Sequence, residues 1–117
     1  MKAKKVKVAC NFVVIGMALS LLLPLGVIAA EADFTVVIRD HRFQPNELKV
    51  PADTKIKLKI DNQDASPEEF ESKSLNREKV IAGKSSATIL VGPLKPGRYP
   101  FYGEFNEKTA IGAIVVE

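Results

Sequence analysis

The sequence predicts an all-β fold, a Greek-key sandwich or barrel of about seven strands, preceded by a signal helix at the N-terminus. Three observations support this fold class. From residue 33 onward, short apolar runs are separated by Gly, Pro, Asn and Asp, a pattern typical of sandwiches and barrels. Residues 55–60 alternate strictly between lysine and an apolar residue, which is the period of a half-buried strand. No part of this region carries the apolar period of a long helix.

The first thirty residues read as a targeting segment. Four lysines and no acid occupy residues 2–7, an apolar stretch follows at residues 8–25, and Ala29 and Ala30 close it. A basic start, an apolar centre and small residues at the end describe a secretory signal peptide. The alternative is an uncleaved membrane anchor, because the apolar stretch nearly spans a bilayer. We therefore expect a signal peptide at residues 1–30 and one domain at residues 31–117, periplasmic or otherwise exported.

Setting the leader apart changes the charge of the chain. The whole sequence has 17 Lys and Arg residues, 14 Asp and Glu residues and a formal charge of +3. Four of the basic residues lie in the leader, so residues 31–117 carry 13 basic and 14 acidic residues, a formal charge of −1. This part also has no Cys and no Met, since Cys10, Met1 and Met17 precede it. No basic patch is left to favour a nucleic-acid partner.

The first half of the domain gives three strands. Residues 34–38 are apolar and β-branched and end before Asp40, residues 43–46 contain Pro45 and predict a turn, and residues 47–50 form a short strand that ends at Pro51. Residues 54–61 are the clearest element. Ile56, Leu58 and Ile60 share one face and three lysines share the other, which predicts an antiparallel strand with its lysines in water.

The second half continues in the same way. Residues 62–67 form a polar turn, residues 68–72 a short strand with Phe70 inward, and residues 75–81 a strand or helical turn. Three further strands are predicted, at residues 86–91, 98–102 and 111–116. The first follows a turn at Gly83, and the second follows Pro96 and Gly97.

Four short motifs in this order resemble the cupredoxin superfamily. They are F-x-P-x-x-L-x-V-P-A at residues 43–52, N-Q-D at residues 62–64, L-K-P-G-R-Y-P-F-Y at residues 94–102 and G-A-I-V-V at residues 112–116. The resemblance implies a cupredoxin-like sandwich over the whole mature domain. It does not carry the copper ligands, because Glu68 stands at the first His position, Gly103 at the Cys position and Asn106 near the second His. A type 1 copper centre needs a thiolate and two imidazoles, so blue-copper electron transfer is excluded.

A narrower resemblance is to the EfeO-type cupredoxin-like family. It is carried by P-E-E-F-E-S at residues 67–72, L-N-R-E-K-V at residues 75–80, G-P-L-K-P-G at residues 92–97 and G-E-F-N-x-x-T-A-x-G at residues 103–112. That resemblance implies a periplasmic domain associated with iron-permease systems, in which carboxylates replace the Cys and His ligands and iron or copper is bound or handed over. His41 matches a His often found in the small stand-alone members, whereas Asn106 departs from a position that commonly carries His.

Carboxylates and one imidazole are the groups that could bind a metal here. They are hard ligands suited to iron and other oxygen-preferring cations. Glu69 and Glu71 project together from the face opposite Phe70, by strand alternation. The candidates are His41, Glu68, Glu69, Glu71, Glu78 and Glu104, and the expected ligand set is His41, Glu68, Glu69, Glu71 and Glu104. The alternative is that these acids are solvated or paired with Arg39, Arg42, Arg77 and Lys79.

The expected function is therefore binding rather than catalysis. No nucleophilic Cys, G-x-S-x-G elbow or Gly-rich phosphate loop occurs in the sequence. We expect a monomeric, exported accessory that binds an iron or copper ion and transfers it to a membrane metal-transport protein or a periplasmic partner, touching the membrane itself only if the leader is uncleaved. The alternative is a metal-free sandwich that serves as a protein-interaction module.

Overall fold

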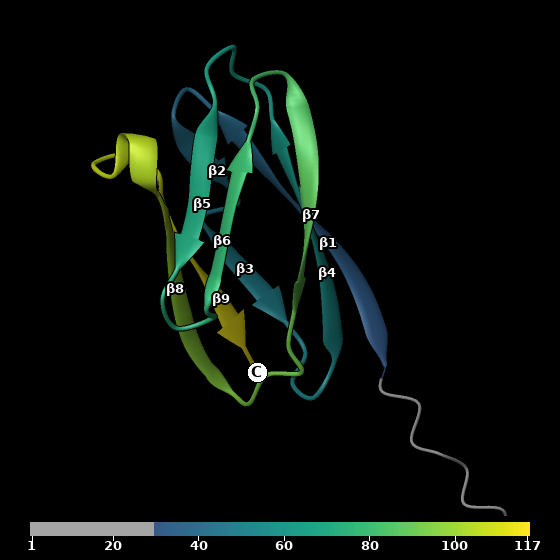
Figure 1. Cartoon of the computed structure of the whole chain (residues 1–117). Helices are drawn as coiled ribbons and strands as arrows, with labels where there is room; N and C mark the ends of the chain where they lie inside the picture. Colours follow the sequence, from purple (N-terminus) through teal and green to yellow (C-terminus); the bar gives the residue numbers. More distant parts are fainter. Residues whose placement is uncertain (1–29) are drawn as a thin grey trace, which may run out of the picture.

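The computed structural model describes residues 30–117, which form nine strands and one short 3-10 helix (Figure 1). The predicted signal helix and all but the last residue of the predicted signal peptide lie outside this range. Within it, no helix has the length and apolar character needed to cross a membrane. The elements are β1 (Glu31–Arg39), β2 (Arg42–Gln44), β3 (Glu47–Val50), β4 (Lys55–Asn62), β5 (Glu68–Ser72), β6 (Arg77–Ile81), β7 (Ser85–Val91), β8 (Gly97–Gly103), η1 (Glu104–Asn106) and β9 (Ile111–Val116).

Two sheets face each other, as the sequence predicts. One has the strand order β2-β1-β4-β7 and the other the order β3-β9-β8-β5-β6. The all-β sandwich is confirmed, with two more strands than the predicted seven. One addition is β2, which occupies part of the predicted turn at residues 43–46; Phe43 is only 3% exposed, and its burial holds this segment against β1. The other is β6, which resolves the choice between strand and helical turn at residues 75–81.

β4 shows the predicted alternation of burial. Ile56, Leu58 and Ile60 are buried, while Lys55, Lys57 and Lys59 are exposed. The prediction of purely antiparallel pairing is wrong, because β4 pairs parallel with β1 and antiparallel with β7. Alternation reports which side chains are buried and carries no information on the direction of the neighbouring strand.

The core between the sheets contains three phenylalanines in mutual contact. The ring centroid of Phe101 lies 4.9 Å from that of Phe43 and 4.9 Å from that of Phe70, and Phe43 meets Phe101 edge-on. Gly112 makes room for this cluster, since a Cβ there would lie 2.5 Å from the Phe101 ring. Because Phe70 and Phe101 face inward, their neighbours on β5 and β8 face outward. This fixes the outer face of the β3-β9-β8-β5-β6 sheet.

Candidate metal centre

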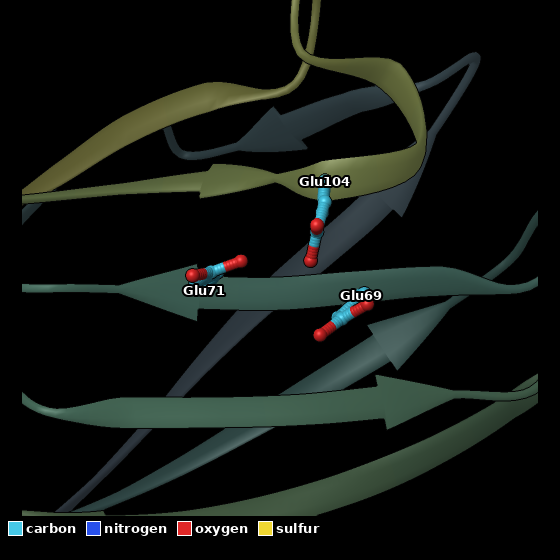
Figure 2. A group of neighbouring side chains, drawn as sticks. All are labelled: Glu69, Glu71 and Glu104. Atoms are coloured by element: carbon cyan, nitrogen blue, oxygen red, sulfur yellow. The ribbon is translucent and has the colours of Figure 1, made fainter.

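Three glutamates converge on the outer face of this sheet. Glu69 and Glu71 flank the inward-facing Phe70 on β5, and Glu104 is the first residue of η1, directly after β8. Each offers a carboxylate oxygen, and these oxygens all lie within 4.8 Å of one another. Figure 2 shows Glu104 reaching from its own segment toward the space between the other two side chains. We refer to Glu69, Glu71 and Glu104 as the carboxylate cluster.

The carboxylate cluster concentrates negative charge at a partly buried place. Glu69 is 8% exposed, Glu71 is half-buried and Glu104 is exposed. The neighbouring carboxyl of Glu78, followed by burial and by Glu104, raises the pKa of Glu69 to about 7. Hydrogen bonding with Glu104, followed by burial, raises the pKa of Glu71. Glu69 and Glu71 thus hold a proton more readily than a free carboxyl does, because the protonated form shares a hydrogen bond with a neighbouring carboxylate and costs less to bury.

Of the two alternatives considered from the sequence, solvation or pairing with basic side chains, no ion pair within residues 30–117 shows the second at the carboxylate cluster. The ion pairs within residues 30–117 join Arg98 to Glu47 and His41 to Asp64. Arg77 instead donates to the backbone carbonyl of Leu90, at 2.8 Å, and to that of Asn76, at 2.9 Å. The charge of the cluster is therefore left to solvent, to protons or to a bound cation.

Two further side chains border the cluster. Glu78 on β6 lies directly opposite Glu71 in the antiparallel register of β5 and β6, and Tyr102 on β8 lies opposite Glu71 from the other side. Burial and the charge of Glu71 raise the pKa of the Tyr102 hydroxyl. Glu78 is a candidate that the expected ligand set leaves out, and Tyr102 is not among the candidates. Strand alternation places Tyr102 outward once Phe101 faces inward, but only the strand register shows that both side chains flank Glu71.

Glu68 lies apart from the cluster, on the core side of β5. It is 1% exposed. Its Oε1 accepts hydrogen bonds from the backbone N–H of Glu69, at 3.0 Å, and of Phe105, at 2.9 Å, while its Oε2 accepts one from Asn106 Nδ2 at 2.7 Å. All three partners are donors, so protein groups occupy both carboxylate oxygens.

His41 is also outside the cluster. It lies in the turn between β1 and β2, where both Asp40 and His41 have positive φ angles of 52° and 56°. Asp64 stabilises this turn by accepting from the backbone N–H of both residues, and its Oδ2 lies 3.6 Å from His41 Nδ1. These bonds, chiefly the one from the His41 N–H, lower the pKa of Asp64. The imidazole borders an open depression of about 500 Å³ whose wall includes Glu104 and Asn106.

Comparison with known proteins gives the family. The family model described as "Cupredoxin-like domain" matches residues 11–116. The chain belongs to the cupredoxin-like family. The uncharacterized protein RP394 of Rickettsia prowazekii (strain Madrid E) is 48% identical over 81 residues, which are 69% of this chain. The match spans 65% of the length of that relative.

Solved structures of copper proteins share the fold of this cupredoxin-like chain. Auracyanin A, a blue copper protein from Chloroflexus aurantiacus, has a TM-score of 0.66 and 11% identity, covering 75% of this chain and all of that one. The metal-binding domain of the Cu(I)-exporting ATPase CopA from Streptococcus pneumoniae D39, with Cu(I), has a TM-score of 0.67 and 13% identity, covering 75% and 87%. A mutant of amicyanin in its reduced state has a TM-score of 0.59 and 17% identity, covering 74% and 83%. At these identities the likeness establishes the fold alone.

The residues of this cupredoxin-like domain do not fit a blue-copper centre. The positions that the motifs match to copper ligands hold Glu68, Gly103 and Asn106, and Glu68 and Asn106 are hydrogen-bonded to each other. Gly103 packs against this pair: a Cβ there would lie 2.6 Å from Glu68 Cδ and 2.6 Å from Ala110 Cβ. Neither a thiolate nor two imidazoles are present in residues 30–117, whereas blue copper requires both.

Proposed function

We propose that this protein binds an oxygen-preferring metal ion, iron in the first place, at the carboxylate cluster and passes it to a membrane metal transporter. The observation that carries the proposal is the convergence of Glu69, Glu71 and Glu104 to within 4.8 Å. Like-charged side chains this close oppose one another, and a bound cation converts that repulsion into attraction.

The chemistry of the donors favours hard cations. Carboxylate oxygens suit iron, manganese and similar ions, whereas Cu(I) prefers thiolate and thioether sulfur. The outer face of the sheet leaves the cluster open on the Glu104 side, where the side chain is exposed. Such a site permits release as well as capture, as transfer to a partner requires.

Metal binding at this cluster is coupled to protons. With the pKa of Glu69 at about 7, the apo cluster retains part of a proton at neutral pH. A cation must displace that proton, so its affinity rises as the pH increases from about 6 to about 8. Release therefore becomes easier on acidification.

The destination of the metal rests on sequence features. The basic and apolar pattern of residues 1–30 supports export, and the resemblance to EfeO-type domains supports an iron-transport partner. We propose that the exported protein is a periplasmic, monomeric carrier without enzymatic activity.

Calorimetric titration with Fe²⁺ under anaerobic conditions, Fe³⁺ and Cu²⁺ tests the proposal. We expect one iron per chain, with Glu71→Gln and Glu104→Gln each weakening the affinity. The matched control is Asp53→Asn, because Asp53 is an exposed acid outside the cluster whose φ of 53° asparagine also tolerates. Iron affinity that is equal in the native protein and both Gln variants would contradict the proposal.

A metal-free interaction module is the second candidate, and one observation favours it. Apolar side chains gather beside the carboxylate cluster: Phe105 is 52% exposed and Ile111 is 57% exposed, and Ile111 lines an open groove with Pro100 and Tyr102. Such exposed apolar surface is typical of protein contacts. Absence of heat with all three metals, together with an unchanged melting temperature, would favour this module over the metal carrier.

A further inference from the structure

We infer that Glu68 is a positioning residue for the metal centre: its buried carboxylate anchors η1 to β5 and so holds Glu104 beside Glu69 and Glu71. This inference rests on the proposed metal function and adds to it a residue that binds no metal itself. Glu68 occupies the place that the motifs match to the first copper ligand, and its interactions there are made with the protein.

The cluster depends on two separate elements being held together. Glu69 and Glu71 come from one strand and are fixed by the backbone of β5, which pairs on both sides with β6 and β8. Glu104 comes from η1, at the start of the loop that leads to β9. In Figure 1 this loop projects from the end of β8 beyond the body of the sandwich. The position of Glu104 therefore depends both on the pairing of Gly103 with Phe70 and on the contacts that hold η1 against β5.

The loop closes on itself through its backbone. The N–H of Gly103 donates to the carbonyl of Ala110 at 2.8 Å, and the carbonyl of Asn106 accepts from the N–H of Ala110 at 2.8 Å. These bonds shape the loop, and the pairing of Gly103 with Phe70 holds the start of the loop beside β5. Neither interaction joins Phe105 or Asn106 to β5. Glu68 ties η1 to β5 through two hydrogen bonds, because its carboxylate accepts from the Phe105 N–H and from Asn106 Nδ2.

Burial makes this anchor specific. Glu68 is 1% exposed, so no bulk water can replace a lost partner at low cost. Gly103 lies directly against the carboxylate, since a Cβ there would lie 2.8 Å from Glu68 Oε1. Gly103 thus limits the space around this carboxylate, and Phe105, the residue next to Glu104 on the loop, donates to it. Groups that orient metal ligands in this way typically change metal affinity by about 10–100-fold when removed.

Swapping the carboxylate and the amide between positions 68 and 106 tests the inference. Asn106→Asp places two carboxylates against each other, so we expect η1 to detach and Mn²⁺ affinity to fall by about tenfold or more. In the double variant Glu68→Gln/Asn106→Asp, the Gln carbonyl accepts from the Glu69 and Phe105 N–H groups and its amide donates to Asp. We expect this variant to recover the native affinity. Glu68→Gln alone is expected to be mild, because the Asn106 amide can rotate to present its oxygen.

Two NMR measurements report on the attachment of the loop and on metal binding at the cluster. We would measure hydrogen exchange at the Phe105 amide and the broadening of amide resonances by Mn²⁺. In the native protein Mn²⁺ broadens the amides around Glu69, Glu71 and Glu104; in Asn106→Asp the same broadening should require about tenfold more Mn²⁺, and the Phe105 amide should lose protection. Ser72→Ala is the control, because Ser72 is buried on the same strand and bonds to the Pro100 carbonyl at 2.6 Å without contacting η1. It is expected to lower stability and leave both readouts unchanged.

The possible failures are distinguishable. Absence of Mn²⁺ broadening at the cluster in the native protein would overturn the proposed function and this inference together. An Mn²⁺ affinity in Asn106→Asp equal to that of the native protein, with the Phe105 amide still protected, would overturn this inference alone. A double variant as weak as Asn106→Asp would also overturn it, because the geometry requires restored hydrogen bonding to restore binding.

Discussion

Replacing Gly103 with alanine probes the packing between β8 and Glu68. The backbone of Gly103, with φ −92° and ψ 111°, is open to any residue, so backbone strain plays no part. The new Cβ would lie 2.6 Å from Glu68 Cδ and 2.6 Å from Ala110 Cβ. Carbon atoms in contact prefer a separation of about 3.5–4.0 Å, so each neighbour must retreat by about 1 Å.

The free energy of unfolding is expected to fall by about 3 kcal/mol. Added volume in a packed interior typically costs about 1–3 kcal/mol. Retreat of Glu68 also weakens its bonds from the Phe105 N–H and Asn106 Nδ2, and hydrogen bonds to charged groups contribute about 1.5–3 kcal/mol each. If Ala110 also moves away from the new Cβ, both the packing cost and the loss of hydrogen bonding are smaller than these values. For a domain of this size, about 3 kcal/mol corresponds to a decrease in Tm of roughly 12–24 °C.

Urea unfolding at pH 7, followed by far-UV circular dichroism, measures this loss. Arg98→Ala on the same strand is the control, because it removes only an exposed ion pair, Arg98 Nη1 to Glu47 Oε1 at 2.7 Å. Exposed pairs contribute at most about 1 kcal/mol. A loss for Gly103→Ala no larger than that of the control would refute the packing described for Glu68.

Three other expectations concern stability. In the presence of a chelator, the domain should be more stable at pH 5 than at pH 8. The pKa of Glu69 is about 7 in the folded state and about 4.5 in the unfolded chain. The folded state therefore binds this proton more tightly, and the resulting stabilisation is lost as the pH rises from about 4.5 through about 7. Urea midpoints across this range should show the slope in the native protein and a shallower one in Glu69→Gln. Phe101→Ala should cost about 3–5 kcal/mol in the same assay, since it empties the centre of the aromatic cluster. Finally, Mn²⁺ at about 100 times its Kd should add about 2.7 kcal/mol at pH 7.5, and EDTA should reverse the gain; no change in the thermal melt would argue against a site.

Much of the fold follows from local pattern. The alternation at residues 55–60 predicts the buried face of β4, and Pro and Gly mark most strand ends, because burial and turn chemistry are local properties of the chain. Strand partners are a different matter. The parallel pairing of β1 with β4 and the formation of β2 depend on contacts between distant segments, which periodicity does not encode.

The candidate site likewise has residues that local pattern places and residues that only distant contacts place. Glu69 and Glu71 could be placed together from their spacing about Phe70, and Glu104 was within the expected ligand set. The roles of Glu78 and Tyr102 follow from the register of β5 with its two neighbours. Glu68 shows the limit most clearly: its parity with Phe70 indicates that it points inward, but its three hydrogen-bond donors come from β5 and from η1, 37 and 38 residues further along the chain.

Locating the metal tests the central claim most directly. Crystals of the protein soaked with Mn²⁺ at pH 7.5 would be used to compute an anomalous difference map. We predict one peak on the outer face of the β3-β9-β8-β5-β6 sheet, between the carboxylates of Glu69, Glu71 and Glu104, with Glu68 still bonded to Asn106. A peak between Glu68 and Asn106, or no peak at the three glutamates in crystals that contain Mn²⁺, would contradict the account.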